Sequence, residues 1–330
     1  YFLTDDNFAR NKHWEPLIDR LLALRAQGLK IEFAVQVDTL AHRIPNFIDK
    51  VCEAGASEIF IGLENINSDN LEATKKRQNR IEEYREMFLA WKKRRVFIVC
   101  GYIIGFPNDT RASILRDIET IKRTLPIDAL YINFLTPLPG SEDHREMVRR
   151  GEWMDDDLGK FTLSHRVTHH PRMSDEEWEA AYHDAYDAFY DYAHIETIFR
   201  RRFAGRAPMP LTTLHRVMFY RVSANVMGVS KLEGGLIRVR RRRQRRRGLA
   251  LESPFVFYPR FAWRFASEGA RIFATYLKMR VILRRVRRDP DRRAYRDEAI
   301  TAPIKGGDDA LITATRVTDN AARRMQRAAT

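Results

Sequence analysis

The sequence has very little cysteine: 330 residues contain only Cys52 and Cys100, which lie far apart. Two cysteines cannot build a disulfide framework, so a reducing cytosol is the expected compartment. The sequence also lacks an apolar run close to the roughly 20 residues that span a bilayer. The longest candidate, residues 96–107, contains two glycines and ends in proline, so we interpret it as a buried strand. The three clustered histidines at positions 165, 169 and 170 lack a further ligand at a suggestive spacing, and we predict no metal site there.

Excess positive charge is nearly absent from the first half of the chain. Residues 1–150 contain 23 of the 58 Lys and Arg residues and 22 of the 44 Asp and Glu residues, a net charge of +1. Residues 151–330 contain the other 35 basic and 22 acidic residues, a net charge of +13. This shift predicts a domain boundary near residue 150. A basic surface favours anionic partners, either nucleic acid or anionic lipid.

Residues 1–150 alternate short apolar stretches with amphipathic ones, which is typical of a parallel sheet or barrel with helical crossovers. Glycine stops and helical spacing between the apolar stretches favour helices, and we expect Asp109 to cap the helix that begins near residue 112. The five expected strands cover residues 1–4, 31–37, 58–63, 96–105 and 129–135.

Residues 151–330 have the pattern of helices without strands. Ser174-Asp-Glu-Glu177 forms a capping box and predicts one long helix to about Arg202. Residues 211–227 indicate another helix, and residues 254–259 an aromatic turn. Eight of the ten residues from 238 to 247 are arginine, and residues 261–288 read as a basic amphipathic helix. The last forty or so residues are polar, and we expect them to be loosely held.

Polar or glycine residues follow each expected strand, at the edge where parallel α/β structures bind ligands. Each has a simpler interpretation as a helix cap or a turn, because Asp, Asn and Gly are favoured there. For Gly101 and Gly105, the alternative to a barrel bend is close approach of a flat ring to the backbone. Gln36, Tyr102 and Asn133 could also line a substrate. The strand-end candidates are Asp5, Asp6, Asn7, Gln36, Asp38, Glu64, Asn65, Gly105, Phe106, Asp109 and Thr136.

Four short segments that contain these candidate residues resemble the barrel strands of the radical S-adenosylmethionine (SAM) superfamily. Gly101-Tyr-Ile-Ile-Gly105 is similar to the glycine-x-isoleucine-x-glycine motif of its fifth strand, where relatives add a glutamate and this chain has Asn108 and Asp109. The turn from Thr136 to Gly140 resembles the branch with a cobalamin-binding domain, which includes the anaerobic magnesium-protoporphyrin ester cyclases. The other two segments are Asp5-Asp-Asn-Phe8 and Ile61-Gly-Leu-Glu-Asn65.

The resemblance implies a partial (β/α)6 TIM-type barrel in which strands two to six are present. Residues 1–150 would be a radical SAM core incomplete at its N-terminus, residues 151–205 a helical segment packed on the barrel, and residues 206–330 a basic helical extension. The superfamily holds a [4Fe–4S] cluster with a C-x-x-x-C-x-x-C loop, which this sequence lacks, and the chain begins at Tyr1. We therefore expect a C-terminal fragment, inactive alone, whose cluster ligands lie outside this chain.

The resemblance also assigns SAM-binding roles by position. Asp6 and Asn7 would lie near the methionyl end of SAM, and Glu64 and Asn65 near the ribose. The implied chemistry is reductive cleavage of SAM to a 5′-deoxyadenosyl radical, which would serve methyl transfer or oxidative cyclisation if cobalamin is bound outside this chain. The remaining assigned positions are Gln36 on the substrate side and Gly101, Gly105 and Phe106 against adenine.

Several alternatives remain open from the residues alone. A cluster-free barrel could act as a binding or scaffold protein, and the arginine-rich segment could serve a tRNA-modifying enzyme. The segment from Arg238 to Arg288 could instead dock on an anionic membrane, or simply be a solvated basic segment that packs on the barrel. Between the two partners we favour membrane over nucleic acid, because aromatic residues are interleaved with its arginines. The expected partners are a small-molecule or lipid substrate and a reducing electron donor. We expect the protein to be cytoplasmic, and to associate peripherally with the inner face of the membrane if the basic segment docks there.

Overall fold

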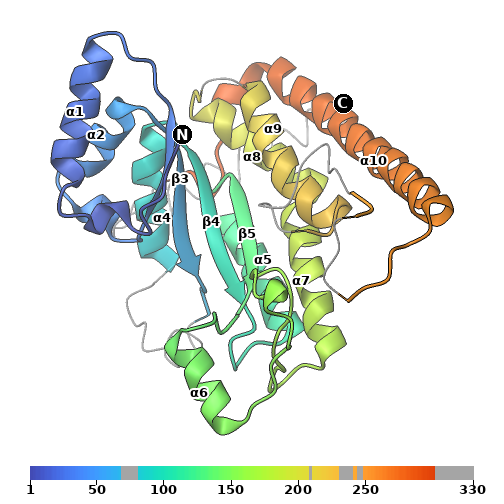
Figure 1. The fold of residues 1–330 in the computed structure, drawn as a ribbon. Helices are drawn as coiled ribbons and strands as arrows, with labels where there is room; N and C mark the ends of the chain where they lie inside the picture. The colour runs from blue at the N-terminus through green and yellow to red at the C-terminus, as the bar shows by residue number, and fades with distance from the viewer. Residues whose placement is uncertain (68–80, 208–209, 230–240, 244–247, 302–330) are drawn as a thin grey trace. The chain divides into compact units, whose positions relative to one another are not determined.

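Five parallel strands form one sheet whose spatial order is the order of the sequence, β1-β2-β3-β4-β5. The computed structural model describes residues 1–67, 81–207, 210–229, 241–243 and 248–301. The arrows of β3, β4 and β5 point toward the end of the sheet where α6 lies (Figure 1). This confirms the predicted parallel α/β architecture of a partial barrel followed by a mainly helical region. The strands are β1 (Phe2–Leu3), β2 (Phe33–Val37), β3 (Ala56–Glu64), β4 (Phe97–Ile104) and β5 (Ala129–Phe134).

Helices cover one face of this sheet because each crossover has an apolar stripe. Trp14 and Trp91 pack edge-on against Phe47 at ring distances of 4.8 and 6.2 Å, which joins three crossover helices in one core. The alternate strand residues Ile59, Ile61 and Leu63 are fully buried against these helices. The helices of this half are α1 (Trp14–Ala26), α2 (Phe47–Ala54), α4 (Ile81–Lys93), α5 (Arg111–Thr124) and α6 (Glu142–Arg150).

The second half is helical, and α7 runs along the β5 side of the sheet (Figure 1). The single helix expected from Ser174 to Arg202 is wrong. The chain breaks at Tyr190, and the Asp191 carboxylate caps a second helix by accepting the His194 N–H at 2.7 Å. The helices are α7 (Asp175–Phe189), α8 (Tyr192–Ala204), α9 (Pro210–Arg221) and α10 (Pro254–Arg288).

The aromatic turn expected at residues 254–259 is also wrong, because α10 begins at Pro254 and continues through Pro259. Pro254 occupies the first helical position, where an N–H has no helical partner, and Pro259 removes one bond near the start of the helix. Of the arginine-rich residues 238–247, only Arg241, Arg242 and Arg243 lie within the described residues. The last forty or so residues were expected to be loosely held, and for residues 290–301 this is wrong: Asp297 pairs with the buried Arg201 at 2.7 Å and Ala299 is fully buried. Residues 302–330 lie outside the described part.

Tyr186 of α7 and Tyr190, the C-cap residue that follows it, close the outer edge of β5. The Tyr186 hydroxyl accepts the N–H and donates to the C=O of Ile132, both at 3.0 Å. The Tyr190 hydroxyl does the same for Leu130, at 3.0 and 2.8 Å. Further along, the Phe134 N–H donates to the Leu163 carbonyl at 2.8 Å. The outward backbone groups of Leu130 and Ile132 and the Phe134 N–H, which would otherwise be unpaired at this edge of the sheet, therefore have partners within the chain.

Candidate functional site

The face of the sheet opposite the crossover helices carries the side chains that could meet a ligand, and we call it the inner face. Strand register aligns Gln36 with Phe60, Gly62 with Gly101 and Ile103 with Asn133. Because alternate strand residues point to opposite faces, these residues lie on the face away from Ile59 and Ile61. The inner face residues are Ala34, Gln36, Phe60, Gly62, Val99, Gly101, Ile103, Tyr131 and Asn133.

Cationic side chains from the helical half close the N-terminal end of the inner face. Arg216 of α9 lies over the Phe97 ring at 5.2 Å and pairs with Glu58 at 3.5 Å. Arg202 of α8 lies over the same ring at 5.8 Å and donates to the Val96 carbonyl at 2.7 Å. A ligand would therefore approach the inner face from the C-terminal ends of the strands, as in other parallel α/β structures.

At the end of β1, Asn7 is committed to a protein partner. Its side-chain amide donates to the Asp38 carboxylate at 3.0 Å, and its carbonyl accepts the Asp38 N–H at 3.2 Å. Burial alone would raise the pKa of Asp38, but hydrogen bonds from Asn7 and Arg10 outweigh it and lower that pKa. Asn7 thus joins the ends of β1 and β2. Asp6 is exposed beside this pair, and its role toward SAM stays a prediction.

At the end of β3, Glu64 has an unfavourable backbone conformation. Its φ is +62°, the strand register shifts between Gly62 and Glu64, and the Asn65 N–H bonds back to the Leu63 carbonyl at 2.9 Å. This is the tight, strained turn that is rare for a residue with a side chain. The turn ends β3 two residues after Gly62, an open position where an added Cβ would meet no atom within 4 Å.

Asn65 itself serves the fold. It is 1% exposed, its side-chain oxygen accepts the Asn67 N–H at 2.7 Å, and its amide reaches the Ile103 carbonyl at 3.4 Å. It therefore ties the end of β3 to β4, and the predicted ribose contact of Glu64 and Asn65 stays a prediction.

The two motif glycines both lie under flat rings, and the rings belong to this chain. An added Cβ on Gly101 would be 2.9 Å from the Phe60 ring, and one on Gly105 would be 2.1 Å from the Trp178 indole. Gly105 also has a φ of +98°. Both positions require glycine for packing, whatever they do toward adenine. A larger residue at Gly105 would therefore disturb folding, so such a variant cannot test SAM binding.

Of the pair Asp109-Thr110, where a helix cap was expected, Thr110 is the cap of α5 and accepts the Ser113 N–H, whereas Asp109 does not cap the helix. The buried Asp109 carboxylate instead accepts the N–H groups of Gly105 and Phe106, at 2.8 and 3.0 Å. This turn after β4 places Phe106 in the protein, where it is 6% exposed. The Asp109 carboxylate thus fixes the backbone of this turn.

His170 fixes the same turn from the helical half. Its Nδ1 lies 3.1 Å from the N–H groups of Arg172 and Met173, so Nδ1 accepts and Nε2 carries the proton. Nε2 then donates to the Phe106 carbonyl at 2.9 Å. His170, the buried member of the histidine cluster, therefore has a structural role.

Sequence reasoning gave too little weight to Asn133 and placed Tyr102 on the wrong face. Asn133 is 7% exposed on the inner face, and its Oδ1 has no hydrogen-bond partner within the described residues. Tyr102 points to the helices, where its hydroxyl donates to Asp117 at 2.9 Å, and burial raises the pKa of Asp117 to about 6. The period-two alternation of β4 and β5 was the signal that could have separated them.

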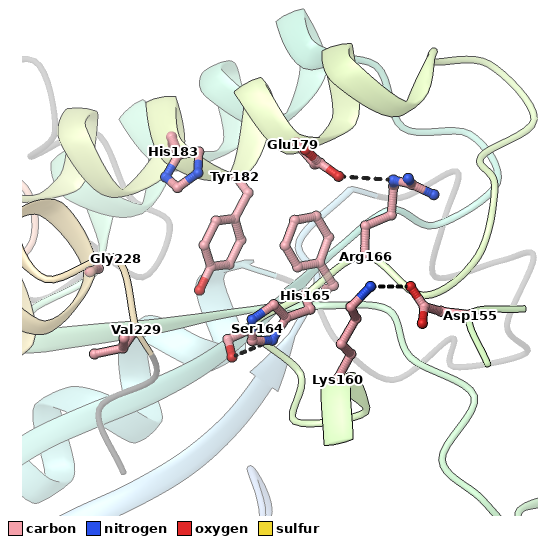
Figure 2. Close-up of a pocket in the computed structure, with 12 residues that line it drawn as sticks. Asp155, Lys160, Ser164, His165, Arg166, Glu179, Tyr182, His183, Gly228 and Val229 are labelled. Carbon is pink, nitrogen blue, oxygen red and sulfur yellow. Dashed lines mark hydrogen bonds and ion pairs between the residues drawn. The ribbon is translucent and has the colours of Figure 1, made fainter. Parts of the chain in front are cut away.

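A separate hollow of about 270 Å³ lies beside the end of β5 (Figure 2). Tyr182 projects into it from α7, with Ser164 and His165 opposite. Its cations are paired, Lys160 with Asp155 at 2.5 Å and Arg166 with Glu179 at 3.2 Å. Its lining includes none of the residues predicted to bind SAM.

Neither cysteine suits an iron–sulfur cluster. Cys100 is fully buried on the helix-covered face of β4, and Cys52 lies on α2. Burial raises the pKa of both thiols, that of Cys52 to about 12, so both are poor thiolate ligands. Within the described residues, no three histidine, cysteine or acidic side chains are grouped as metal ligands would be.

The chain is similar to known methyltransferases over part of its length. No protein-family model matches it. It is 26% identical to bacteriochlorophyllide d C-12(1)-methyltransferase of Chlorobaculum tepidum over 153 residues, which is 45% of this chain and 32% of that protein. It is 26% identical to the uncharacterized methyltransferase PH0819 of Pyrococcus horikoshii over 190 residues, 56% of this chain and 39% of that one. The chain thus spans about a third to two fifths of these relatives.

Among solved structures, the chain is similar to the radical S-adenosylmethionine methyltransferase TsrM of Kitasatospora setae with tryptophan substrate and a SAM analogue bound. The identity is 15%, the TM-score 0.34, and the match covers 41% of this chain and 26% of that one. The two relatives are named as methyltransferases, and the solved structure is named as a radical SAM methyltransferase.

Proposed function

We propose that the chain is part of a radical SAM enzyme that transfers a methyl group to an organic substrate. The four strand motifs and the similarity to methyltransferases support this proposal. The single observation that carries it is the inner face, where the unpaired Asn133 oxygen and the open position at Gly62 lie at the ligand-binding end of a parallel sheet.

The inner face has groups that fit SAM. A buried carbonyl oxygen without a donor is costly, by about 1–3 kcal/mol, unless a ligand supplies the donor. The ammonium and hydroxyl groups of SAM are such donors. Gln36 is partly exposed on the same face, and the Phe60 ring offers an apolar surface beside the space at Gly62.

When bound, SAM supplies an electrophilic methyl group and a sulfonium that can be reduced. The part played by this chain is binding and orientation. Asn133 accepts a hydrogen bond from the ligand, Gln36 offers a second polar contact, and the strained turn at Glu64 holds the rim next to Gly62. The Asp109 carboxylate keeps the turn after β4 rigid. Such preorganisation reduces the ordering cost of binding.

The described residues do not fit the cluster, so we derive no step through it. We propose that its ligands, and cobalamin if the enzyme uses it, are carried outside this chain. A reducing electron donor and an organic substrate are the partners that this chemistry requires.

The test is SAM binding by titration calorimetry with an Asn133→Leu variant. Leucine matches the shape of asparagine and removes the unpaired oxygen, so we expect the fold to be kept and SAM affinity to fall about tenfold or more. The control is Tyr102→Phe, at the same level of the sheet but on the opposite face, which should leave SAM affinity unchanged.

The complete enzyme with its cluster reconstituted anaerobically provides the second readout. Methyl-labelled SAM should transfer its label to product in the wild type, and Asn133→Leu should raise KM for SAM more than it lowers kcat. A chain that binds no SAM in either form would contradict the proposal and support the cluster-free binding protein instead.

A further inference from the structure

Helix α10 has two apolar faces, and within the described residues only one of them packs against the rest of the protein. Residues from Ile272 onward pack against the rest of the protein, and Met279 and Val286 are fully buried. A second set of apolar side chains on the same helix is exposed. This set, which we call the outer ridge, comprises Phe255 (89% exposed), Trp263 (76%), Phe273 (60%), Leu277 (48%) and Val281 (63%).

The outer ridge is one continuous stripe. At 3.6 residues per turn, its five positions fall within an arc of about 80°, roughly opposite the buried set. The stripe runs for about 39 Å along the helix axis, at 1.5 Å per residue. The small residues Ala266 and Ala270 fall in the same arc between Trp263 and Phe273, so no charge interrupts the stripe. Exposed apolar surface of this extent marks an interaction site.

Positive charge flanks the ridge on both sides. The helix contains nine lysines and arginines and one glutamate, Glu268. By the same helical arithmetic, Arg271, Lys278 and Arg285 fall on one flank and Arg280 and Arg287 on the other. Arg271, Lys278 and Arg287 are exposed; Arg285 is exposed as well but pairs with Glu196. The partner must therefore bury apolar side chains along its centre and accept cations at both margins.

We propose that the outer ridge lies in the surface of an anionic lipid bilayer, with α10 parallel to the membrane plane. Aromatic and aliphatic side chains would enter the boundary between headgroups and acyl chains, and the flanking cations would meet anionic headgroups. Within the described residues, no helix is long and apolar enough to cross a membrane.

Two other occupants fit less well. A second copy of the chain would bring together two helices of the same strong positive charge, which is unfavourable without counter-charges. A nucleic acid would place its phosphates against the cations, which lie at the margins of the ridge, and would leave the central aliphatic side chains without an apolar partner.

The test is co-sedimentation of the full chain with vesicles of phosphatidylcholine alone and of equal parts phosphatidylcholine and phosphatidylglycerol. We expect binding to the anionic vesicles only, weakened by high salt. The ridge variant Trp263→Ser/Phe273→Ser should bind about 100-fold more weakly, since each aromatic side chain contributes one to two factors of ten when buried. The flank variant Arg271→Gln/Arg287→Gln should lose about 30-fold, at roughly one factor of five per cation.

The matched control is Val148→Ser/Leu158→Ser, which removes two exposed apolar side chains elsewhere (57% and 67% exposed) and should leave vesicle binding unchanged. All replaced side chains are exposed, and far-UV circular dichroism should show unchanged helix content. Equal vesicle binding by the ridge variant would overturn the proposal, as would absence of vesicle binding by the wild type. Ridge-dependent dimerisation, or ridge-dependent RNA binding in a gel shift at the same salt without vesicle binding, would overturn it as well.

Discussion

Removal of the Tyr186 and Tyr190 hydroxyls should destabilise the protein far more than a tyrosine-to-phenylalanine change normally does. Each hydroxyl bonds both the N–H and the C=O of one residue on the outer edge of β5, and both side chains are buried. Burial raises the pKa of both hydroxyls, so they stay protonated and can donate at any moderate pH. Phenylalanine would leave two buried backbone groups without partners at each site.

The size of the effect follows from the cost of an unsatisfied buried group, about 1–3 kcal/mol. With two groups left unpaired at each site, each single variant should lose about 2–6 kcal/mol of unfolding free energy, and the double variant about 4–12 kcal/mol. The total stability of a typical protein is about 5–15 kcal/mol, so the double variant should be close to unfolding at 25 °C.

Urea unfolding of Tyr186→Phe, Tyr190→Phe and the control Tyr258→Phe measures this. Tyr258 is 58% exposed, so its variant should change stability by no more than about 0.5 kcal/mol. Amide hydrogen exchange gives an independent readout, because the Leu130 and Ile132 amides should exchange faster when their acceptors are lost. If both edge variants match the control in urea and in exchange, the hydroxyls are not what satisfies this strand and our reasoning is wrong.

Three further predictions concern the C-terminal end of the sheet. Because burial raises the pKa of Asp117 to about 6, above the usual 3.8, this side chain stabilises the fold most below pH 4 and that contribution is lost as pH rises through 6. The unfolding free energy of Asp117→Asn should therefore exceed that of the wild type by up to about 3 kcal/mol at pH 8 and by little at pH 4. Urea midpoints at both pH values measure this difference, and an equal increase at both would contradict the assignment. Gly105→Ala should lower the unfolding free energy by more than about 3 kcal/mol, because the added Cβ would overlap the Trp178 indole ring. Gly62→Ala should lower it by about 1 kcal/mol or less, and similar melting temperatures for the two variants would disprove this contrast. Asp109→Ala should lower the unfolding free energy by about 3–5 kcal/mol, because two buried N–H groups lose their acceptor. Asn108→Ala is the neighbouring control in the same thermal assay, and equal losses of stability in the two variants would refute the role of the carboxylate.

The strands could be predicted because each has a local signal. Apolar runs bounded by Gly, Asn and Asp gave the five strands, and the alternation of strands and helices gave their parallel order. The helix break at Tyr190 was missed because the aromatic spacing from Trp178 continues across it. Asp191 was a cap signal that the periodicity concealed.

The site was harder to predict because its residues act through contacts distant in sequence. The motif implied open backbone at Gly101 and Gly105, but nothing in their local sequence indicates that Phe60 and Trp178 lie on them. Asn7 looked available until its pairing with Asp38, 31 residues later, was seen. Asp109 looked like a cap because Thr110, the true cap, follows it directly. A side chain's type was readable from the sequence, but its partner was not.

The tyrosine contacts on β5 also have a consequence for synthesis of the chain. Tyr186 and Tyr190 lie 54 and 60 residues after the strand positions that they protect. A ribosome adds about 5–20 residues per second, so the edge of β5 exists for about 3–12 s before its own cover has been made. During that interval the nascent sheet offers a row of unpaired backbone groups to any neighbouring strand. This protein should therefore depend on chaperones most strongly in the seconds between synthesis of β5 and synthesis of α7.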